Sequence, residues 1–380
     1  MWIINTKIYS EEHIFVDGEI EIVGDRIRNV NFTPGTHMYE ETIDAKGAYA
    51  IPGLIDMHFH GCMGADVCDG TTDAWNTIAE YEAGIGVTAI CPATMTLSVP
   101  ELEKILEVGS KYASLNHPGA DIVGINMEGP FISVQKKGAQ KAEDIVPCNT
   151  KTAERFLEKS KGLVKIIGLA PEEGDSPAYI KAVKDKVIVS LAHTNAEYEI
   201  AVQAIDAGAS HIVHLYNAMT PMNHRNPGVV GAAADRDVTI ELICDGVHIH
   251  PAMVRNTFKL FGADRIMLIS DSMRATGLAD GVYTLGGQDV QVQGKNARLT
   301  SDGAIAGSVT SLPECVRCAV KEMGIPLETA VRCATENPAK RLGVWTDRGS
   351  ISVGKIADIC LWDKELNLVN VIKSGKMIEV

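Results

Sequence analysis

Apolar residues in the middle of the chain occur in eight short runs, separated by segments with helical periodicity. The runs cover residues 51–58, 87–93, 121–128, 163–170, 187–193, 210–216, 238–244 and 265–271. Most are nearly continuous, which is typical of parallel strands covered on both faces. Helical patterns at 72–83, 100–115, 150–161, 195–207 and 251–261 fill most of the gaps, with Asn195 as a candidate N-cap. This alternation favours an α/β fold with a closed (β/α)8 TIM-like barrel over an open sheet.

Both ends of the chain have a different pattern. Residues 1–50 alternate apolar and polar positions and contain Gly24-Asp25, a signal for a tight hairpin turn. Residues 344–380 also consist of short β-branched runs. We therefore expect a small β-sandwich domain built from 1–50 and 344–380, and a barrel over 51–343. Within the barrel, 278–300 predicts an inserted hairpin, and 311–323 and 327–342 predict helices.

Length and composition narrow the class of protein. A barrel takes roughly 250 residues, so a chain of 380 residues has room for a second, smaller domain. The hydrophobic fraction of 46% with 22% charged residues is ordinary for a globular protein. No apolar run reaches the roughly 20 residues that cross a bilayer, and the first residues lack the layout of a secretory signal. We expect a cytoplasmic protein.

Charge and cysteine content exclude further classes. A net charge of −14 argues against nucleic acid or an anionic membrane as partner, because both require a positive field. Nine cysteines without regular spacing indicate reduced thiols. Cys315 and Cys318 form a C-x-x-C, but in an expected helix with no second pair nearby, so we interpret them as packing residues.

The chemistry-bearing residues stand at the C-terminal ends of the expected strands. His58 and His60 are two residues apart, a spacing that turns both imidazoles to one side of a strand. Asp56 shares this parity and is a candidate to orient them. An isolated H-x-H pair is weak evidence. Because all parallel barrel strands point their C-terminal ends at one face, the H-x-H pair indicates a metal site only if the other strands also end in metal-binding residues.

Three more strands end in metal-binding residue types. Glu128 ends the third run, His193 the fifth and His214 the sixth, whereas His211 lies on the opposite strand face and is excluded as a co-ligand. Nitrogen and carboxylate ligands without cysteine favour zinc or iron. Glu128, His193 and His214 suffice for one divalent ion, and His58 with His60 provides for a second. The sequence leaves both the metal and the number of ions open.

Asp271 ends the eighth run and is the candidate general base. A metal ion lowers the pKa of a bound water to about 7. A carboxylate within hydrogen-bond reach can accept the proton and later transfer it to a leaving amine. The simpler interpretation, a strand-end aspartate that caps the next turn, becomes less attractive beside five potential metal ligands.

The H-F-H motif after PGLID resembles the amidohydrolase superfamily, whose members hydrolyse amide and related bonds on a metal-bearing barrel flanked by a small β domain. The ordered strings MEGPF, LAPE, AHTNA, HLYNAM, PGVVGA, CDGVH and SDSMRATG are similar to its N-acetylglucosamine-6-phosphate deacetylase family over nearly the whole chain. The resemblance implies hydrolysis of the acetamide of a phosphorylated amino sugar. It also implies Glu128, His193 and His214 as principal metal ligands and Asp271 as the catalytic acid and base.

The same resemblance implies a substrate site. Sugar and acetamide contacts are expected from Ala139, Gln140, Asn217, Ala218 and His248, with Ile305, Ala306 and Gly307 closing over the ligand. His248, preferred to His250, would also polarise the carbonyl. Arg225 corresponds to an arginine that reaches the phosphate bound by the neighbouring subunit, which implies a homodimer or a larger homo-oligomer.

Two alternatives remain open from the sequence. The first is a related amidohydrolase that acts on another N-acetyl amino-sugar phosphate or on a cyclic amide. The second is an interaction protein that kept the barrel and lost its chemistry; such a chain is expected to lose ligands, whereas this one has a candidate at every position. Some members of the family carry histidine in place of Gln140, so the hydrogen bond made by this residue is also open.

Overall fold

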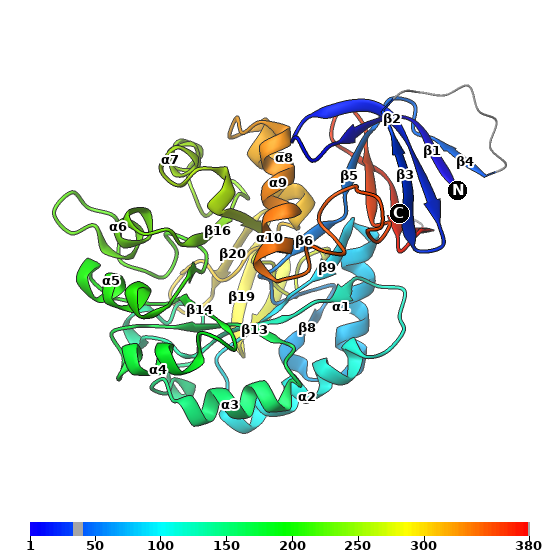
Figure 1. Ribbon diagram of the computed structural model, residues 1–380. Helices are drawn as coiled ribbons and strands as arrows, with labels where there is room; N and C mark the ends of the chain where they lie inside the picture. The colour runs from blue at the N-terminus through cyan, green and yellow to red at the C-terminus, as the bar shows by residue number, and fades with distance from the viewer. Residues whose placement is uncertain (33–40, 379–380) are drawn as a thin grey trace.

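The computed structural model describes residues 1–32 and 41–378. A barrel of parallel strands surrounded by helices makes up most of the molecule, and a smaller β domain lies beside it, with strands from both ends of the chain (Figure 1). The expected (β/α)8 barrel and separate β domain are therefore confirmed. Among the described residues, no helix is long and apolar enough to span a bilayer.

The barrel strands follow the eight apolar runs closely. They are β6 (Leu54–Asp56), β9 (Val87–Ile90) with β10 (Ala93–Thr94), β11 (Asp121–Ile122) with β12 (Ile125–Phe131), β13 (Val164–Leu169), β14 (Ile188–Leu191), β15 (His211–Ile212), β16 (Thr239–Ile243) and β17 (Ile266–Ile269). Parallel pairing runs in the order β10-β12-β13-β14-β15-β16-β17, and β9 pairs with both β6 and β11. At the site end, Asp271 N donates to His58 O (2.9 Å) and His60 N donates to Ser272 O (2.7 Å), which joins the last strand to the first.

Helices cover the outside of the barrel (Figure 1). They are α1 (Thr72–Gly84), α2 (Val99–Ala113), α3 (Thr150–Lys159), α4 (Ser176–Val183), α5 (Tyr198–Ala207), α6 (Gly228–Asp235), α7 (Pro251–Phe261), α8 (Leu312–Lys321), α9 (Leu327–Ala334) and α10 (Glu336–Arg341). Five lie in expected segments between strands, whereas α4 and α6 were not expected. The helix expected over 327–342 is divided at Thr335, which has non-helical backbone angles.

The expected N-cap of α5 was wrong. Its cap position is Glu197, which makes no capping hydrogen bond through its side chain. Asn195 stands two residues earlier, where its side-chain amide donates to Gln135 Oε1 (2.7 Å) and its backbone N–H donates to Glu172 (2.5 Å). The asparagine therefore ties together loops at the active face instead of starting the helix.

The small domain is a sheet in the order β23-β22-β21-β5-β1-β2-β3, with β4 also on β1. The N-terminal strands are β1 (Trp2–Tyr9), β2 (Phe15–Val23), β3 (Arg26–Asn31), β4 (Thr42–Asp44) and β5 (Tyr49–Pro52); the C-terminal ones are β21 (Ile359–Trp362), β22 (Leu368–Lys373) and β23 (Lys376–Ile378). Val23 pairs with Arg26 across Gly24-Asp25, so the expected hairpin is present. Buried isoleucines and alanines of the small domain form a hydrophobic core separate from that of the barrel.

The chain passes from the small sheet to the barrel at Gly53. The apolar run 51–58, expected as one barrel strand, is divided here, because β5 pairs with β21 of the small sheet and β6 begins the barrel. A side chain at Gly53 would lie 2.2 Å from Thr88 Oγ1, so only glycine fits where the strands diverge. The domain boundaries 1–50, 51–343 and 344–380 otherwise stay a prediction.

Two smaller sheets complete the active face. β7 (Gly61–Cys62) pairs with β8 (Ala65–Asp66), and β18 (Gly281–Leu285), β19 (Gln288–Gln293) and β20 (Asn296–Leu299) form an antiparallel sheet in the expected insertion. Its apolar side chains pack with Met95, Ala139 and Met273. All nine cysteines are free, and Cys315 and Cys318 are buried on α8, as expected for packing residues.

Candidate active site

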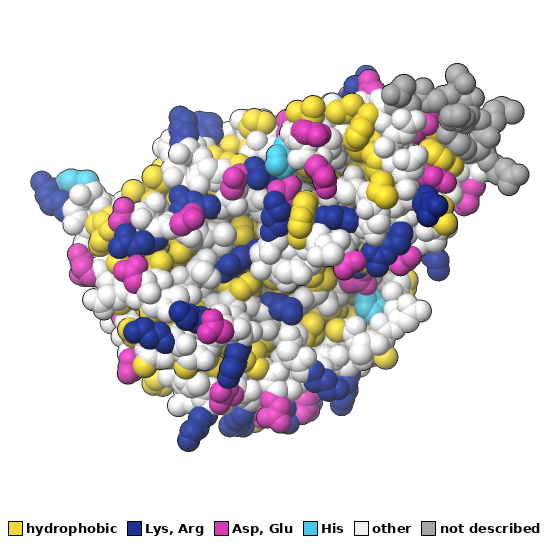
Figure 2. Space-filling view, in the orientation of Figure 1, with side chains coloured by type: hydrophobic (Ala, Val, Ile, Leu, Met, Phe, Trp, Pro, Cys, Tyr) yellow, Lys and Arg dark blue, Asp and Glu magenta, His cyan; other side chains and the backbone are white. Residues whose placement is uncertain are grey.

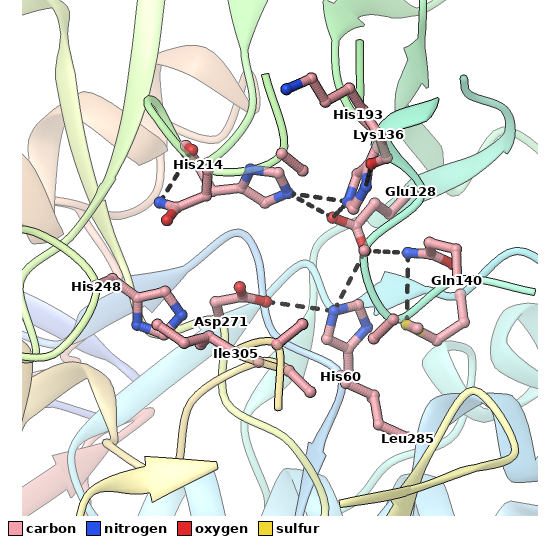
Figure 3. A pocket seen from close by; sticks show the side chains of 18 of the residues that line it. His60, Glu128, Lys136, Gln140, His193, His214, His248, Asp271, Leu285 and Ile305 are labelled. Carbon is pink, nitrogen blue, oxygen red and sulfur yellow. Dashed lines mark hydrogen bonds and ion pairs between the residues drawn. The ribbon is translucent and has the colours of Figure 1, made fainter. Parts of the chain in front are cut away.

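Glu128 lies at the centre of the cluster at the C-terminal ends of the strands. Its Oε1 is 2.7 Å from His214 Nε2 and 2.9 Å from His193 Nε2, and these two nitrogens are 3.3 Å apart. All three residues are buried. Figure 3 shows the two imidazoles turned toward the carboxylate from neighbouring strands. The structure thus brings together residues that are 86 positions apart in the chain.

His58 and His60 approach the same carboxylate from the first barrel strand. His58 Nε2 is 3.5 Å from Glu128 Oε1, and His60 Nε2 is 3.4 Å from Glu128 Oε2. Asp271 Oδ1 lies 3.3 Å from His60 Nε2 and 3.8 Å from His58 Nε2. Two sets of three potential ligand atoms lie within 4.8 Å of one another, His58 with His60 and Asp271, and His58 with Glu128 and His214.

Backbone conformation at three of these residues is unusual. His193, His214 and Asp271 have φ values of 43°, 26° and 50°, a region that residues other than glycine seldom occupy. Each stands two positions beyond the end of its strand. Such conformations cost about 1–3 kcal/mol each and cluster at functional sites. The turn they impose directs each side chain over the mouth of the barrel.

A glycine makes a similar turn possible after Glu128. Gly129 has a φ of 110°, and a side chain there would lie 2.2 Å from Thr96 Oγ1. The carboxylate of Glu128 is held by Gln140, whose Nε2 donates to Oε2 (2.7 Å) while its Oε1 accepts from Thr96 N (2.6 Å). Both ends of the Gln140 amide are therefore engaged with the protein, although the residue lines the cavity.

His60 and His193 are oriented through their second nitrogens, whereas His214 Nδ1 makes no hydrogen bond with any described residue. His193 Nδ1 lies 2.8 Å from Lys136 O, and His60 Nδ1 lies 3.1 Å from Ala93 O. Both Nδ1 atoms can donate only if they carry a proton, and in the neutral imidazole this leaves Nε2 with a free lone pair for a metal ion. Asp56 does not contact the imidazoles, contrary to the role proposed for it. It accepts from the backbone N–H of His58 (3.2 Å) and from Ser270 Oγ (2.5 Å).

Two carboxylates beneath the cluster were missed by sequence reasoning. Glu241 and Asp245 are buried, Glu241 in β16 and Asp245 just after it. Glu241 Oε2 lies 2.7 Å from His58 Nδ1, and Asp245 Oδ2 lies 2.7 Å from His248 Nδ1. Their only sequence signal was a charged residue within or just beyond a strand that is otherwise apolar.

The electrostatics of the cluster favour charged carboxylates. Burial opposes ionisation of Glu128, but the charges and hydrogen bonds of the surrounding imidazoles outweigh it and hold the pKa of Glu128 well below its usual range. For Asp271, burial is likewise outweighed, mainly by the imidazole of His60, so its pKa is lowered. Burial also disfavours the charged form of His248, yet the hydrogen bond and charge of Asp245 raise the pKa of this imidazole.

A cavity of about 340 Å³ opens above the cluster. The residues that line it include most of the expected site: His60, Glu128, Ala139, Gln140, His193, His214, Asn217, Ala218, His248, Asp271, Ile305, Ala306 and Gly307. His58 lies beneath, fully buried. Additional lining residues are Met95, Gln135, Lys136, Gly138, Leu285 and Ala304. Segment 305–307 is tied to the site because Ser308 N donates to Asp271 O (2.7 Å).

Two of the candidates lie elsewhere. His250 is exposed and accepts from Ala252 N as the N-cap of α7, so it does not line the cavity, whereas His248 does. Arg225 is exposed on the loop before α6, with Nη1 beside His224 Nε2. This loop projects from the barrel at the left of Figures 1 and 2. Arg225 is therefore not part of its own chain's cavity.

The donor atoms fit a divalent metal ion. Two nitrogens on a tetrahedral zinc at about 2.05 Å would be about 3.3 Å apart, and His193 Nε2 and His214 Nε2 are separated by 3.3 Å. Asp271 Oδ1 and His58 Nε2 are buried in the cluster and make no hydrogen bond with any described residue. Buried polar atoms without partners are costly unless a ligand satisfies them.

Comparison with known proteins supports this interpretation. Residues 49–378 match the amidohydrolase family. The chain is 35% identical over 376 residues to N-acetylglucosamine-6-phosphate deacetylase of Bacillus subtilis, covering 97% of this chain and 95% of that one. It is also 35% identical to N-acetylgalactosamine-6-phosphate deacetylase of Escherichia coli O157:H7, covering 86% of each. The crystal structure of N-acetyl-D-glucosamine-6-phosphate deacetylase from Mycobacterium smegmatis superimposes with a TM-score of 0.93 at 30% identity, covering 100% of both chains. Fold, site and sequence agree, and the chain belongs to the amidohydrolase family.

Proposed function

We propose that this protein hydrolyses the acetamide of N-acetylglucosamine 6-phosphate to give glucosamine 6-phosphate and acetate. The observation that carries the proposal is the convergence of five potential metal ligands and Asp271 in one cluster at the base of a cavity. Relatives with this activity match the chain over nearly its full length. The cavity volume of about 340 Å³ is within the range of small-molecule sites.

The metal is proposed to be zinc or iron, held by Glu128, His193 and His214, with His58 and His60 available for a second ion. Nitrogen and carboxylate donors suit both metals. When bound, the ion supplies Lewis acidity, which makes water nucleophilic at neutral pH and polarises a carbonyl oxygen. The protein's own residues then have to hold the substrate and move protons.

Asp271 is proposed as the proton carrier. Its carboxylate borders the cavity and is ionised at neutral pH, since its pKa is lowered. It can accept a proton from the attacking water and transfer it to the departing nitrogen, so one group serves as base and then as acid. Its backbone is fixed by hydrogen bonds to His58 and Ser308, which keeps the carboxylate at the mouth of the barrel.

His248 is proposed to donate a hydrogen bond to the acetamide oxygen. Figure 3 shows its ring beside Asp271 at the edge of the cavity. Its Nδ1 is engaged by Asp245, so Nε2 can donate to substrate only when the imidazole carries both protons. The raised pKa of His248 favours this form near neutral pH.

This role predicts a pH effect for Asp245→Asn. Removing the carboxylate should lower the pKa of His248 by about 1 unit or more. The donating form is present below this pKa and is lost as pH rises through it, so the alkaline limb of kcat/KM should move to lower pH. A pH profile from acetate release measures the shift. The surface variant Asp235→Asn should leave the limb in place, and an unshifted limb in Asp245→Asn would remove His248 from this role.

The phosphate needs a cationic partner. Of the described residues that line the cavity, Lys136 alone is a lysine or arginine. We propose that Arg225 of a neighbouring subunit provides a second cation, because its guanidinium presents a fork of donors that matches phosphate. The proposed assembly is a homodimer or a larger homo-oligomer in which this loop reaches the next cavity.

Arg225→Ala should therefore raise KM for the phosphorylated sugar by about 10- to 100-fold, the effect of losing hydrogen bonds to a charged group. Activity toward unphosphorylated N-acetylglucosamine should not change. The control variant Arg236→Ala should leave KM for the phosphorylated sugar at its wild-type value. Mixing Arg225→Ala with Asp271→Asn subunits provides the decisive control. If Arg225 acts across the interface, mixed dimers regain one complete site; absence of recovery would place the arginine in its own chain's site.

The test of the function is acetate release from a panel of N-acetyl amino sugars. Phosphorylated N-acetylglucosamine should be the best substrate, and cyclic amides should not react. N-acetylgalactosamine 6-phosphate is the second candidate, since a relative that deacetylates it is equally identical to this chain. A larger kcat/KM for the galactosamine epimer would reverse the assignment. The cytoplasmic location stays a prediction.

A further inference from the structure

Glu241 is a fully buried carboxylate beneath the proposed metal site, with no exposed surface. It belongs to β16, and its carboxylate lies between the rings of His58 and His211. Oε2 lies 2.7 Å from His58 Nδ1 and also accepts the backbone N–H of His214 (3.1 Å). Oε1 lies 3.0 Å from His211 Nε2. One carboxylate therefore contacts the ring of one candidate ligand and the backbone of another.

These contacts fix two separate features of the cluster. With its Nδ1–H donated to Glu241, the neutral His58 ring directs the lone pair of Nε2 into the cluster, the form that binds a metal ion, and this atom has no hydrogen-bond partner among the described residues. The bond from His214 N anchors a backbone with a φ of 26°. We propose that Glu241 is the positioning residue of the metal site, acting through His58 and His214, an inference that rests on the metal role given to this cluster above.

On the His211 side of Glu241, the hydrogen bonds can be kept when the charge of the carboxylate is removed. His211 Nδ1 lies 2.7 Å from Thr239 Oγ1, which in turn lies 3.1 Å from Ser210 O. If Glu241 became glutamine, its amide N–H would face His211, which could accept through Nε2 and donate through Nδ1 to Thr239. The amide oxygen would remain as acceptor for His58 and His214. Glutamine thus keeps the reach of the side chain without its charge, whereas aspartate keeps the charge without the reach.

The experiment compares Glu241→Asp with Glu241→Gln by zinc titration against a chelator of known affinity, using the purified full chain. Loss of a residue that orients a metal ligand typically weakens metal binding by about 10- to 100-fold. We expect this loss for Glu241→Asp, with near-wild-type affinity for Glu241→Gln. Glu82→Asp is the matched control, because Glu82 is a buried glutamate of α1 that makes no hydrogen bond with the cluster. Circular dichroism checks folding, and Glu241→Met, which fills similar space without an acceptor, replaces the aspartate variant if that fails to fold.

The outcomes separate this inference from the proposed function. Zinc affinity in Glu241→Asp equal to wild type would overturn the positioning role alone. A loss in Glu241→Gln as large as that in Glu241→Asp would show that the site also requires the charge of Glu241, so position alone would not explain its effect, and the inference would be overturned. A wild-type chain that binds no zinc or iron would overturn both proposals. Because the readout is ion affinity, a chain that binds zinc but releases no acetate would leave the positioning role standing while the deacetylase proposal fails.

Discussion

Asp271→Asn is expected to lower kcat by about 100- to 10,000-fold, the usual contribution of a positioned acid or base. Asparagine has nearly the same shape and can still contact His60, but it cannot accept the proton released by water or return it to the leaving nitrogen. Acetate release under single-turnover conditions measures the chemical step. KM should change little, because the substrate contacts proposed above for His248, Asn217 and Arg225 are made by other side chains.

Metal content distinguishes this role from a purely structural one. Asp271 Oδ1 is 3.3 Å from His60 Nε2, so the residue is close enough to contribute to the second ion. We expect elemental analysis of Asp271→Asn to find the ion held by Glu128, His193 and His214 at its wild-type level. Asp69→Asn, a change outside the cluster at a residue that pairs with Arg274 and accepts the backbone N–H of Asp66, should behave as wild type. Substantial turnover by Asp271→Asn would transfer the proton role to another group.

The lowered pKa of Asp271 also sets the pH range in which it matters. A carboxylate whose pKa is depressed is active as a base above that pKa and is lost as pH falls through it. Its acid limb should therefore lie below about 3.9, the ordinary value of an aspartate. Changes in rate between pH 5 and pH 9 should come from other groups, with His248 as the candidate for the alkaline limb.

The sequence predicted the barrel because its evidence is periodic and repeated. Eight apolar runs predicted the strands. To place the residues at their ends together, it was enough to know that parallel barrel strands share one active face. Helix α6 escaped prediction because GVVGAAAD is apolar on all sides and contains glycine, so it has no amphipathic pattern. The second half of β5, residues 51–52, was assigned to the barrel because the apolar run continues without interruption through Gly53, where the chain changes domain.

The site was predicted at the level of residue types and not of contacts. Strand parity placed His58 and His60 on one side and excluded His211, whose imidazole indeed faces Glu241 and Thr239. The residues that orient the metal ligands depend on tertiary packing, which strand parity does not describe. Parity therefore selected Asp56, whereas Glu241 makes the contact with the His58 ring. The left-handed backbone at His193 and His214 has no sequence signal, because turns of this kind usually contain glycine.

Removal of the metal should abolish acetate release and lower the thermal stability of the protein. A ligand that binds only the folded state adds about 2.7 kcal/mol when its free concentration is 100-fold above its Kd. Glu128→Gln should reproduce both effects at ordinary zinc concentrations, since it removes the carboxylate that contacts His193 and His214. Calorimetry with and without chelator measures the change in Tm. Glu82→Gln, a buried change outside the cluster, should respond to chelation like wild type.

The loss of Tm on chelation should grow as pH rises. Without an ion, burial opposes protonation of His58, His60 and His193, but the neighbouring carboxylates outweigh it and raise the pKa of each imidazole. Raised histidine pKa values stabilise the fold below the unfolded value of about 6.5 and cease to do so as pH rises through the folded values. At pH 6 protons therefore replace part of what the ion contributed, whereas at higher pH, as the imidazoles lose these protons, the apo cluster holds carboxylates beside neutral imidazoles. Metal binding also strengthens over this range, because protons no longer compete for the ligands. A chelator effect on Tm that is equal at pH 6 and pH 9 would contradict a metal site built from these histidines.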